Sequence, residues 1–276
     1  MLSQAEKIAR FRALHEEDGI FVIPNPWDAG TARVLASLGF KALATTSAGM
    51  AFSLGLPEGR INLENVLAHC RSIVSATDLP VSADMENGFA DAPAGVAKAI
   101  PQAAATGLAG CSIEDFSGDS DKPIYDFGLT VERVTAAVEA ARALPGDFIL
   151  TARAENFLHG RRDLDDTIKR LQAFEEAGAD VLYAPGLNKL DDIRSLCSSV
   201  GKPVNVVMGL PGATFGIEDL AMAGVRRISV GSAFSRLAFG AVIAAVREIL
   251  DQGTFTFTKD AAGFAQLEDI FRGYEQ

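Results

Sequence analysis

The chain repeats one pattern eight times: a short apolar run, a polar turn and then an amphipathic helical run. The apolar runs are rich in Val, Ile, Leu and Ala and mostly do not alternate with polar residues, which is typical of strands covered on both faces. Eight such units in 276 residues predict an α/β fold, the (β/α)8 TIM barrel. We predict its strands at 20–24, 41–47, 80–86, 109–115, 147–154, 180–185, 203–208 and 226–231.

A doubly wound open sheet is the alternative α/β fold. It normally has fewer units, and it needs a glycine-rich phosphate turn after its first strand. The residues that follow the first predicted strand are Asn25-Pro26-Trp27-Asp28, which do not form such a turn. Because no low-complexity linker divides the chain, we expect one domain over 1–276.

The segment 252–276 lies outside the eight units. It contains a short β-like run at 254–258 and then an appended C-terminal helix that carries Phe264, Leu267, Ile270 and Phe271. Four large apolar side chains on one helix need a surface that covers them. We therefore expect this extension to pack on its own barrel or on a neighbouring subunit.

Composition excludes some partners. The net charge of −11 and the pI near 4.8 argue against a nucleic-acid-binding protein, which needs a basic face. They leave room for a small anionic substrate, because a metal ion and an arginine can reverse the sign of the charge locally. No apolar segment reaches membrane-spanning length, and the three cysteines are far apart without a CxxC pair. We expect a cytoplasmic protein with free thiols and no membrane partner.

Two carboxylates stand at the end of the third predicted strand. Asp84 and Glu86 are two residues apart, so on a strand they point to the same face. Carboxylates held that close repel each other unless a proton or a cation lies between them, and Mg²⁺ is the natural oxygen-ligated cation. On this stretch alone, a solvated strand end followed by an acidic turn is an equally good interpretation.

The other strand ends supply matching chemistry, because a TIM barrel has its active site at the carboxyl ends of its strands. Glu114 ends the fourth predicted strand, and Arg153 follows an apolar run in the fifth, where a cation is costly unless it meets an anion. An ion pair between these two is the plainer interpretation of both. Asn205 lies between valines of the seventh strand and could reach inward. The three histidines fall on predicted helices or loops, so oxygen-ligated metal chemistry is favoured over a histidine zinc site.

The chain resembles the isocitrate lyase and phosphoenolpyruvate mutase superfamily over nearly its whole length. The resemblance rests on five stretches, which are specific only in combination: Thr45-Thr46-Ser47-Ala48-Gly49, Gly55-Leu56-Pro57-Glu58, Ser82-Ala83-Asp84-Met85-Glu86-Asn87-Gly88, Ile113-Glu114-Asp115 and Thr151-Ala152-Arg153-Ala154-Glu155.

The resemblance implies a set of site residues. Mg²⁺, or Mn²⁺, is expected at Asp84, with Glu86 and Glu114 acting largely through metal-bound waters. Ser47, Ala48 and Gly49 are expected to receive a substrate carboxylate, while Arg153 clamps another substrate oxygen. We expect the substrate-binding residues to be Ser47, Ala48, Gly49, Asp84, Arg153 and Asn205, and the catalytic residues to be Arg153, Glu114, Glu58, Lys122 and Tyr125.

Lys122 and Tyr125 enter this set because of the loop after the fourth strand. Members of the superfamily that cleave isocitrate or methylisocitrate carry a cysteine and a histidine there, whereas residues 115–126 contain neither. Phosphonomutases carry a lysine and an asparagine, and here only Lys122 is present. We hypothesise that Tyr125 or Lys122 protonates the enolate when this mobile loop closes over the site.

The resemblance also implies an activity and an assembly. The first hypothesis is a Mg²⁺-dependent lyase that cleaves or decarboxylates a small 2-oxo or 2-hydroxy dicarboxylate through a metal-bound pyruvate-like enolate. The second is a phosphonomutase-like enzyme that acts on a phosphorus–carbon bond. The third, from another class, is a metal-dependent 2-oxo acid binding protein with little turnover. A homo-oligomer, tetramer or dimer, that exchanges its C-terminal helix is expected in each case.

Overall fold

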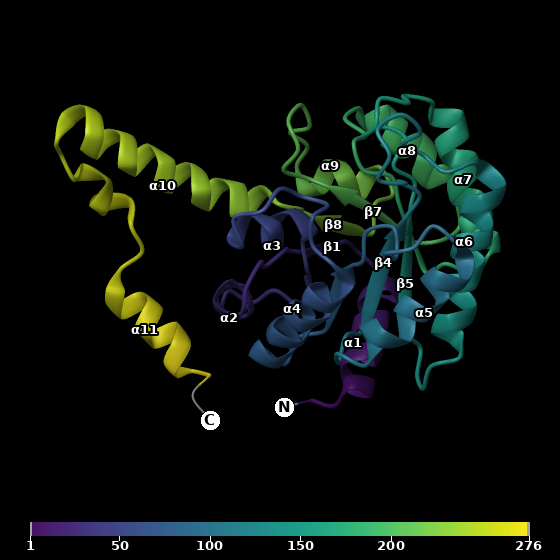
Figure 1. Ribbon diagram of the computed structural model, residues 1–276, viewed down its shortest axis with the longest axis horizontal. Coiled ribbons are helices and arrows are strands. Elements are labelled where there is room, and N and C mark those ends of the chain that lie inside the picture. The colour runs from purple at the N-terminus through teal and green to yellow at the C-terminus, as the bar shows by residue number, and fades with distance from the viewer. Residues whose placement is uncertain (1, 275–276) are drawn as a thin grey trace.

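The computed structural model describes residues 2–274 and has eight parallel strands that curve into a barrel (Figure 1). The strands are β1 (Phe21–Ile23), β2 (Leu43–Ala44), β3 (Val81–Asp84), β4 (Gly110–Glu114), β5 (Ile149–Arg153), β6 (Val181–Tyr183), β7 (Val204–Val207) and β8 (Arg227–Ser229). Their order is β1-β8-β7-β6-β5-β4-β3-β2, and every neighbouring pair is parallel. The backbone N–H of Ala44 donates to the carbonyl of Pro24 at 3.0 Å, which joins β2 to the end of β1 and nearly closes the ring. The predicted TIM barrel is confirmed.

Helices alternate with the strands and surround them. They are α1 (Gln4–Glu16), α2 (Ala29–Ser37), α3 (Ser47–Ser53), α4 (Leu63–Ala76), α5 (Pro93–Ala104), α6 (Phe127–Arg142), α7 (Leu164–Glu176), α8 (Leu190–Ser199), α9 (Ile217–Met222), α10 (Ala233–Gln252) and α11 (Phe264–Arg272). Side chains such as Phe148, Leu150 and Phe174 are almost fully buried between strands and helices. Each burial of this size stabilises the fold by about 1.5–3 kcal/mol.

The leading helix closes the bottom of the barrel. Its start is fixed by a capping box, in which Ser3 and Glu6 hydrogen-bond to each other's backbone N–H groups. Ile8 and Phe11 are buried and pack in one cluster with residues at the amino ends of the strands, including Ile149. The opposite end, where the carboxyl ends of the strands lie, remains open for a site.

Two segments differ from the prediction in the type of element that they form. The strand predicted at 41–47 is only Leu43–Ala44, because Thr46 caps the short helix α3 by accepting a hydrogen bond from the backbone N–H of Gly49. The β-like run predicted at 254–258 is wrong. The chain forms a 3-10 helix there, Thr256–Asp260, held by the carboxylate of Glu248, which accepts bonds from the backbone N–H groups of Thr256 and Phe257.

The C-terminal arm leaves the barrel. Figure 1 shows α10 extending away from the barrel and α11 turning back toward α2. Gly253 ends α10 in the left-handed conformation (φ 65°), and Tyr274 reaches the carbonyl of Arg33 at 3.2 Å. The arm therefore touches its own barrel, yet a row of apolar side chains along α10 stays exposed: Leu237, Phe239, Val242, Ile243, Val246 and Leu250. Within residues 2–274, no helix is both long enough and apolar enough to cross a membrane.

Candidate active site

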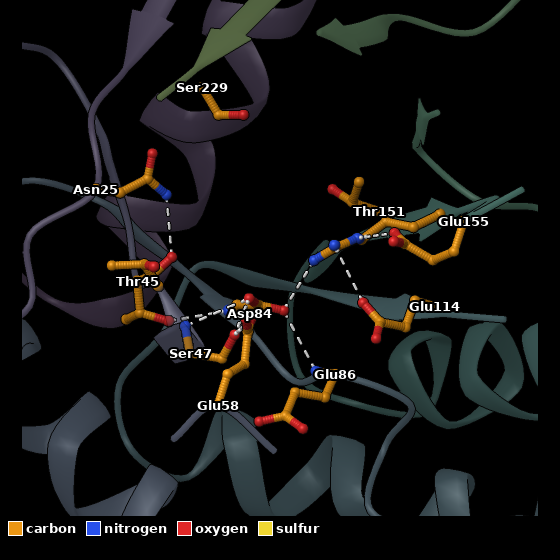
Figure 2. A network of polar contacts seen from close by, with 12 residues as sticks. Asn25, Thr45, Ser47, Glu58, Asp84, Glu86, Glu114, Thr151, Glu155 and Ser229 are labelled. Carbon is orange, nitrogen blue, oxygen red and sulfur yellow. Dashed lines mark hydrogen bonds and ion pairs between the residues drawn. The ribbon is translucent and has the colours of Figure 1, made fainter. Parts of the chain in front are cut away.

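Three adjacent strands bring their terminal charged residues together at the open end of the barrel. Asp84 ends β3, Glu114 ends β4 and Arg153 ends β5, with Glu114 in register beside Arg153. Arg153 Nη1 lies 2.9 Å from Asp84 Oδ1, and its Nη2 lies 3.1 Å from Glu114 Oε2 (Figure 2). Its Nε bonds Glu155 Oε1 at 2.8 Å. Asp84, Glu114 and Arg153, which were predicted from different stretches of sequence, thus share one network.

The electrostatics of this network favour the charged form of Arg153. Burial disfavours the charged form of Arg153, but the charges of Glu155, Glu114 and Asp84 outweigh burial and raise its pKa well above the usual value. Burial raises the pKa of Glu114, and it raises the pKa of Glu155 to about 7. Glu155 was not predicted, although its place two residues after Arg153 at the end of an apolar run was a usable signal.

Asp84 is oriented from its other side by the second strand's turn. Ser47 Oγ donates to Asp84 Oδ2 at 2.9 Å, and the backbone N–H of Asp84 donates to Thr45 Oγ1 at 2.9 Å. Ser47 Oγ also lies 3.2 Å from Glu58 Oε1. Burial and then the charge of Asp84 raise the pKa of Glu58. A carboxyl group with a raised pKa beside a charged cluster is suited to proton transfer.

Glu86 reaches the cluster by a different route from the one predicted. The strand ends at Asp84 rather than at residue 86, so alternation along a strand does not place the Glu86 side chain. Instead Glu86 adopts a left-handed backbone (φ 47°), and its N–H lies 3.3 Å from Asp84 Oδ1. Such a conformation is uncommon for a residue with a side chain and tends to occur at functional sites. Burial, followed by the charges of Asp84 and Glu58, raises the pKa of Glu86 to about 7.

Two cavities open beside the network. The first, of about 200 Å³, is lined by Ser47, Ala48, Asp84 and Arg153, and it extends into the barrel. The second, of about 560 Å³, is lined by Glu86 and Glu114 and by residues of the loop after β4. Glu58 lines both.

The residues present fit an oxygen-ligated divalent cation. Asp84, Glu114 and Glu155 pair with one arginine, and Glu58 and Glu86 lie beside Asp84, so carboxyl groups outnumber cations in the cluster and all its acceptor atoms are oxygens (Figure 2). Within the described residues no three His, Cys, Asp or Glu side chains form a ready-made metal cage. Mg²⁺ usually binds through one or two carboxylates and keeps several waters, so this arrangement suits it.

Of the remaining predicted binding residues, Ala48 and Asn205 line the first cavity and Gly49 does not. Ala48 lines the first cavity beside Ser47. Gly49 packs beneath it, where a Cβ atom would lie 2.5 Å from Thr46 Cγ2 and 3.2 Å from Trp27 Cβ. Asn205 lines the cavity inside the barrel, but its amide group already bonds two neighbouring side chains.

Lys122 and Tyr125 are not brought to the network. Tyr125 Oη bonds Asp91 Oδ1 at 2.5 Å, and Lys122 Nζ pairs with Asp126 at 2.9 Å on the surface. Both residues line a separate surface pocket. Burial and the bond to Asp91 raise the pKa of Tyr125 to about 12. A role for either in proton transfer stays a prediction that requires the loop to move.

Sequence reasoning also missed Arg227, which lines the first cavity. The available signal was the one used for Arg153, an arginine within an apolar strand. Arg227 and Ser229 lie two apart in the eighth predicted strand, and so share a face.

The fold and the cavity define an enzyme-like (β/α)8 barrel with carboxylates and an arginine at the carboxyl ends of its strands. The family model of phosphoenolpyruvate phosphomutase matches residues 11–250, so the chain belongs to that family. Its structural neighbours place it among the lyases and mutases of the isocitrate lyase and phosphoenolpyruvate mutase superfamily, as the sequence predicts.

Three similar proteins illustrate this family. A Burkholderia cenocepacia J2315 protein, provisionally described as a lyase or mutase, is 56% identical with a TM-score of 0.95, and the match covers 97% of this chain and 96% of that one. The structure of 2,3-dimethylmalate lyase is 28% identical with a TM-score of 0.85 over 98% and 95% of the two chains. Escherichia coli 2-methylisocitrate lyase is 31% identical over 78% of this chain and 75% of its own.

Proposed function

We propose that the protein is a Mg²⁺-dependent lyase that acts on a small 2-oxo or 2-hydroxy dicarboxylate. The reaction would break a carbon–carbon bond, or remove CO₂, and pass through a pyruvate-like enolate. The observation that carries this proposal is Arg153, which pairs with Asp84, Glu114 and Glu155 and lines one cavity together with Asp84, Ser47 and Ala48. Two of the similar proteins, 2-methylisocitrate lyase and 2,3-dimethylmalate lyase, are named as lyases, which supports the same class.

Each residue would have a distinct role. The oxygens of Asp84, Glu86 and Glu114 would hold the cation, which supplies positive charge beside the oxygen that becomes negative. Arg153 would donate N–H bonds to that same oxygen or its neighbour, and such preorganised donors stabilise an enolate as it forms. Glu58, whose pKa is raised by burial and by Asp84, would hold or accept the proton that a 2-hydroxy substrate loses.

A phosphonomutase-like activity is the second candidate. It is favoured by the matched family model, which is that of phosphoenolpyruvate phosphomutase. The same arginine and cation would serve it, since a substrate such as phosphonopyruvate also carries a 2-oxo acid group.

One substrate panel distinguishes the lyase, the phosphonomutase-like enzyme and a binding protein. The purified protein is incubated with 2-oxo and 2-hydroxy diacids and with phosphonopyruvate, with Mg²⁺ or with EDTA, and products are followed by proton, carbon-13 and phosphorus NMR. Mg²⁺-dependent release of pyruvate, glyoxylate or CO₂ supports the lyase, while a new phosphorus signal supports the second candidate. Mg²⁺-dependent binding of oxalate or 2-oxoglutarate without any product would instead indicate a binding protein. Turnover that survives both EDTA and the Arg153→Met substitution would contradict the proposal.

We also propose a homo-oligomer in which the arm formed by α10 and α11 packs on a neighbouring subunit. The exposed apolar row on α10 supports it, as does an apolar groove of Phe52, Leu56, Phe239 and Ile243. Light scattering after gel filtration should give a multiple of 29.1 kDa for the wild type. Ile243→Asp should lower the mass, whereas Met222→Asp, an exposed apolar control on α9, should not. A wild-type monomer would refute the assembly.

The proposed setting is the cytoplasm. Cys70, Cys111 and Cys197 are all free thiols, as the sequence predicts, and free thiols are typical of a reducing compartment.

A further inference from the structure

A second arginine lies deep in the first cavity. Arg227 is the first residue of β8, is only 5% exposed, and lines the same cavity as Arg153. Its Nε donates to Asn205 Oδ1 at 2.8 Å and its Nη2 donates to Thr151 Oγ1 at 3.1 Å. Its Nη1 lies 3.3 Å from His15 Nε2. The guanidinium is therefore held in place from three elements: β7, β5 and α1.

All three of these partners are neutral. His15 Nδ1 lies 2.8 Å from the carbonyl oxygen of Phe11, which can only accept, so Nδ1 carries the hydrogen. Nε2 is then a bare acceptor for the N–H of Arg227. Burial, followed by the charge of Arg227, lowers the pKa of His15 to about 3, so the ring is uncharged at any working pH. Asn205 and Thr151 carry no charge, and the three partners thus orient Arg227 without neutralising it.

The two arginines of the cavity differ in this respect. Arg153 is compensated by three carboxylates. Across the described part of the chain, no carboxylate oxygen comes within 4.0 Å of an Arg227 nitrogen. A buried cation without a counterion is costly, and burial lowers the pKa of Arg227 to about 10, so an anion that reached the guanidinium would offset this cost.

We infer that Arg227 binds the second anionic group of the substrate, so that the enzyme selects dianionic 2-oxo or 2-hydroxy acids over monoanionic ones. The inference rests on the proposed function, which places the 2-oxo acid group at Asp84 and Arg153. Ser229 lies two residues further along β8 on the same face and also lines the cavity. Its hydroxyl accepts from Asn205 Nδ2 at 3.0 Å and stands between Arg227 and the opening of the barrel. A distal carboxylate or phosphonate of the substrate would pass this hydroxyl and reach Arg227. Pyruvate has no second anionic group that could do so.

Calorimetric titration tests the inference. The probes are pyruvate, the 2-oxo diacids of four to six carbons, and phosphonopyruvate, each with the wild-type protein in the presence of Mg²⁺. The dianions should bind at least about tenfold more tightly than pyruvate. Arg227→Met should weaken the best-binding dianion about 10- to 100-fold, the range for one hydrogen-bonded charge pair, and leave pyruvate within about threefold. A preference for the diacids or for phosphonopyruvate identifies which anion the site takes.

Two further variants keep the test decisive. Arg227→Lys retains the charge and should restore part of the dianion preference, even where the Met variant folds poorly. Arg226→Met is the matched control, because Arg226 bonds the carbonyls of Glu17 and Gly19 rather than the cavity. It should bind every probe as the wild type does.

The outcomes separate this inference from the proposed function. The role of Arg227 would be overturned if the wild type bound pyruvate and the dianions equally tightly. It would also be overturned if Arg227→Met and Arg227→Lys each lost affinity for pyruvate and for the dianions by the same factor. The proposed function would still stand if Arg153→Met abolished binding of all probes. Absence of any Mg²⁺-dependent binding to the wild type would instead overturn both.

Discussion

Replacing Arg153 by methionine should destabilise the protein, and by an amount that depends on pH. The side chain is 13% exposed and makes ion pairs of 2.9, 3.1 and 2.8 Å with Asp84, Glu114 and Glu155. Methionine fills similar space but leaves three carboxylates without their counterion. Removing one partner of a buried ion pair costs about 3–5 kcal/mol, and we expect a loss of this size in the free energy of unfolding at pH 8.

The loss should shrink in acid. The pKa of Glu114 and that of Glu155 are already raised by burial, and the charge of Arg153 acts to lower both. Without Arg153 these folded-state pKa values rise further above the unfolded-state value. Such groups are neutral in the folded protein below their folded pKa, so stability is regained as pH falls from there toward the unfolded pKa near 4.5. The difference between wild type and variant should therefore be smaller at pH 5.5 than at pH 8.

Urea denaturation in EDTA at the two pH values measures this difference. Arg194→Met is the control, because its pair with Asp191 is exposed and should contribute less than about 1 kcal/mol at either pH. A destabilisation by Arg153→Met below about 1 kcal/mol, or one equal at both pH values, would refute the electrostatic reasoning.

Three other substitutions test the surroundings of the site. Gly49→Ala should lower the free energy of unfolding by about 1–3 kcal/mol, because the new Cβ would lie 2.5 Å from Thr46 Cγ2; calorimetry showing no fall in Tm would contradict the packing. Tyr125→Phe should cost about 1 kcal/mol through the lost bond to Asp91 and leave turnover within about twofold. Lys122→Ala should change neither stability nor turnover, since its ion pair is exposed. A tenfold or larger loss of turnover in either loop variant, without loss of folding, would support the predicted role as proton donor.

The barrel was predictable because its determinants are local and repeated. Each apolar run and each amphipathic helix can be recognised from its own residues. Parallel strands with short connections then bring every strand's carboxyl end to one rim. Asp84, Glu114 and Arg153 could therefore be placed together from sequence. The position of Glu155, two residues after Arg153, made it a candidate, but the sequence alone does not show which of the nearby carboxylates pairs with that arginine.

The rest depends on contacts between distant segments. Glu86 reaches the cluster through a left-handed turn that no strand pattern indicates. Tyr125 is held at Asp91, whose carboxylate accepts its hydroxyl, and Arg133, on α6, lies over its ring at 4.2 Å. The polar surroundings of Arg227 also form only when the chain folds, since Thr151, Asn205 and His15 come from three separate elements.

Titration of Mn²⁺, followed by electron paramagnetic resonance, tests most directly whether Asp84 holds a divalent cation. The wild type should bind Mn²⁺, compete for it with Mg²⁺, and lose at least about tenfold in affinity on Asp84→Asn. Asp126→Asn, which changes a surface carboxylate paired with Lys122, should bind as the wild type does. Equal Mn²⁺ affinity in the Asp84→Asn variant and the wild type, or no binding to either, would contradict the account.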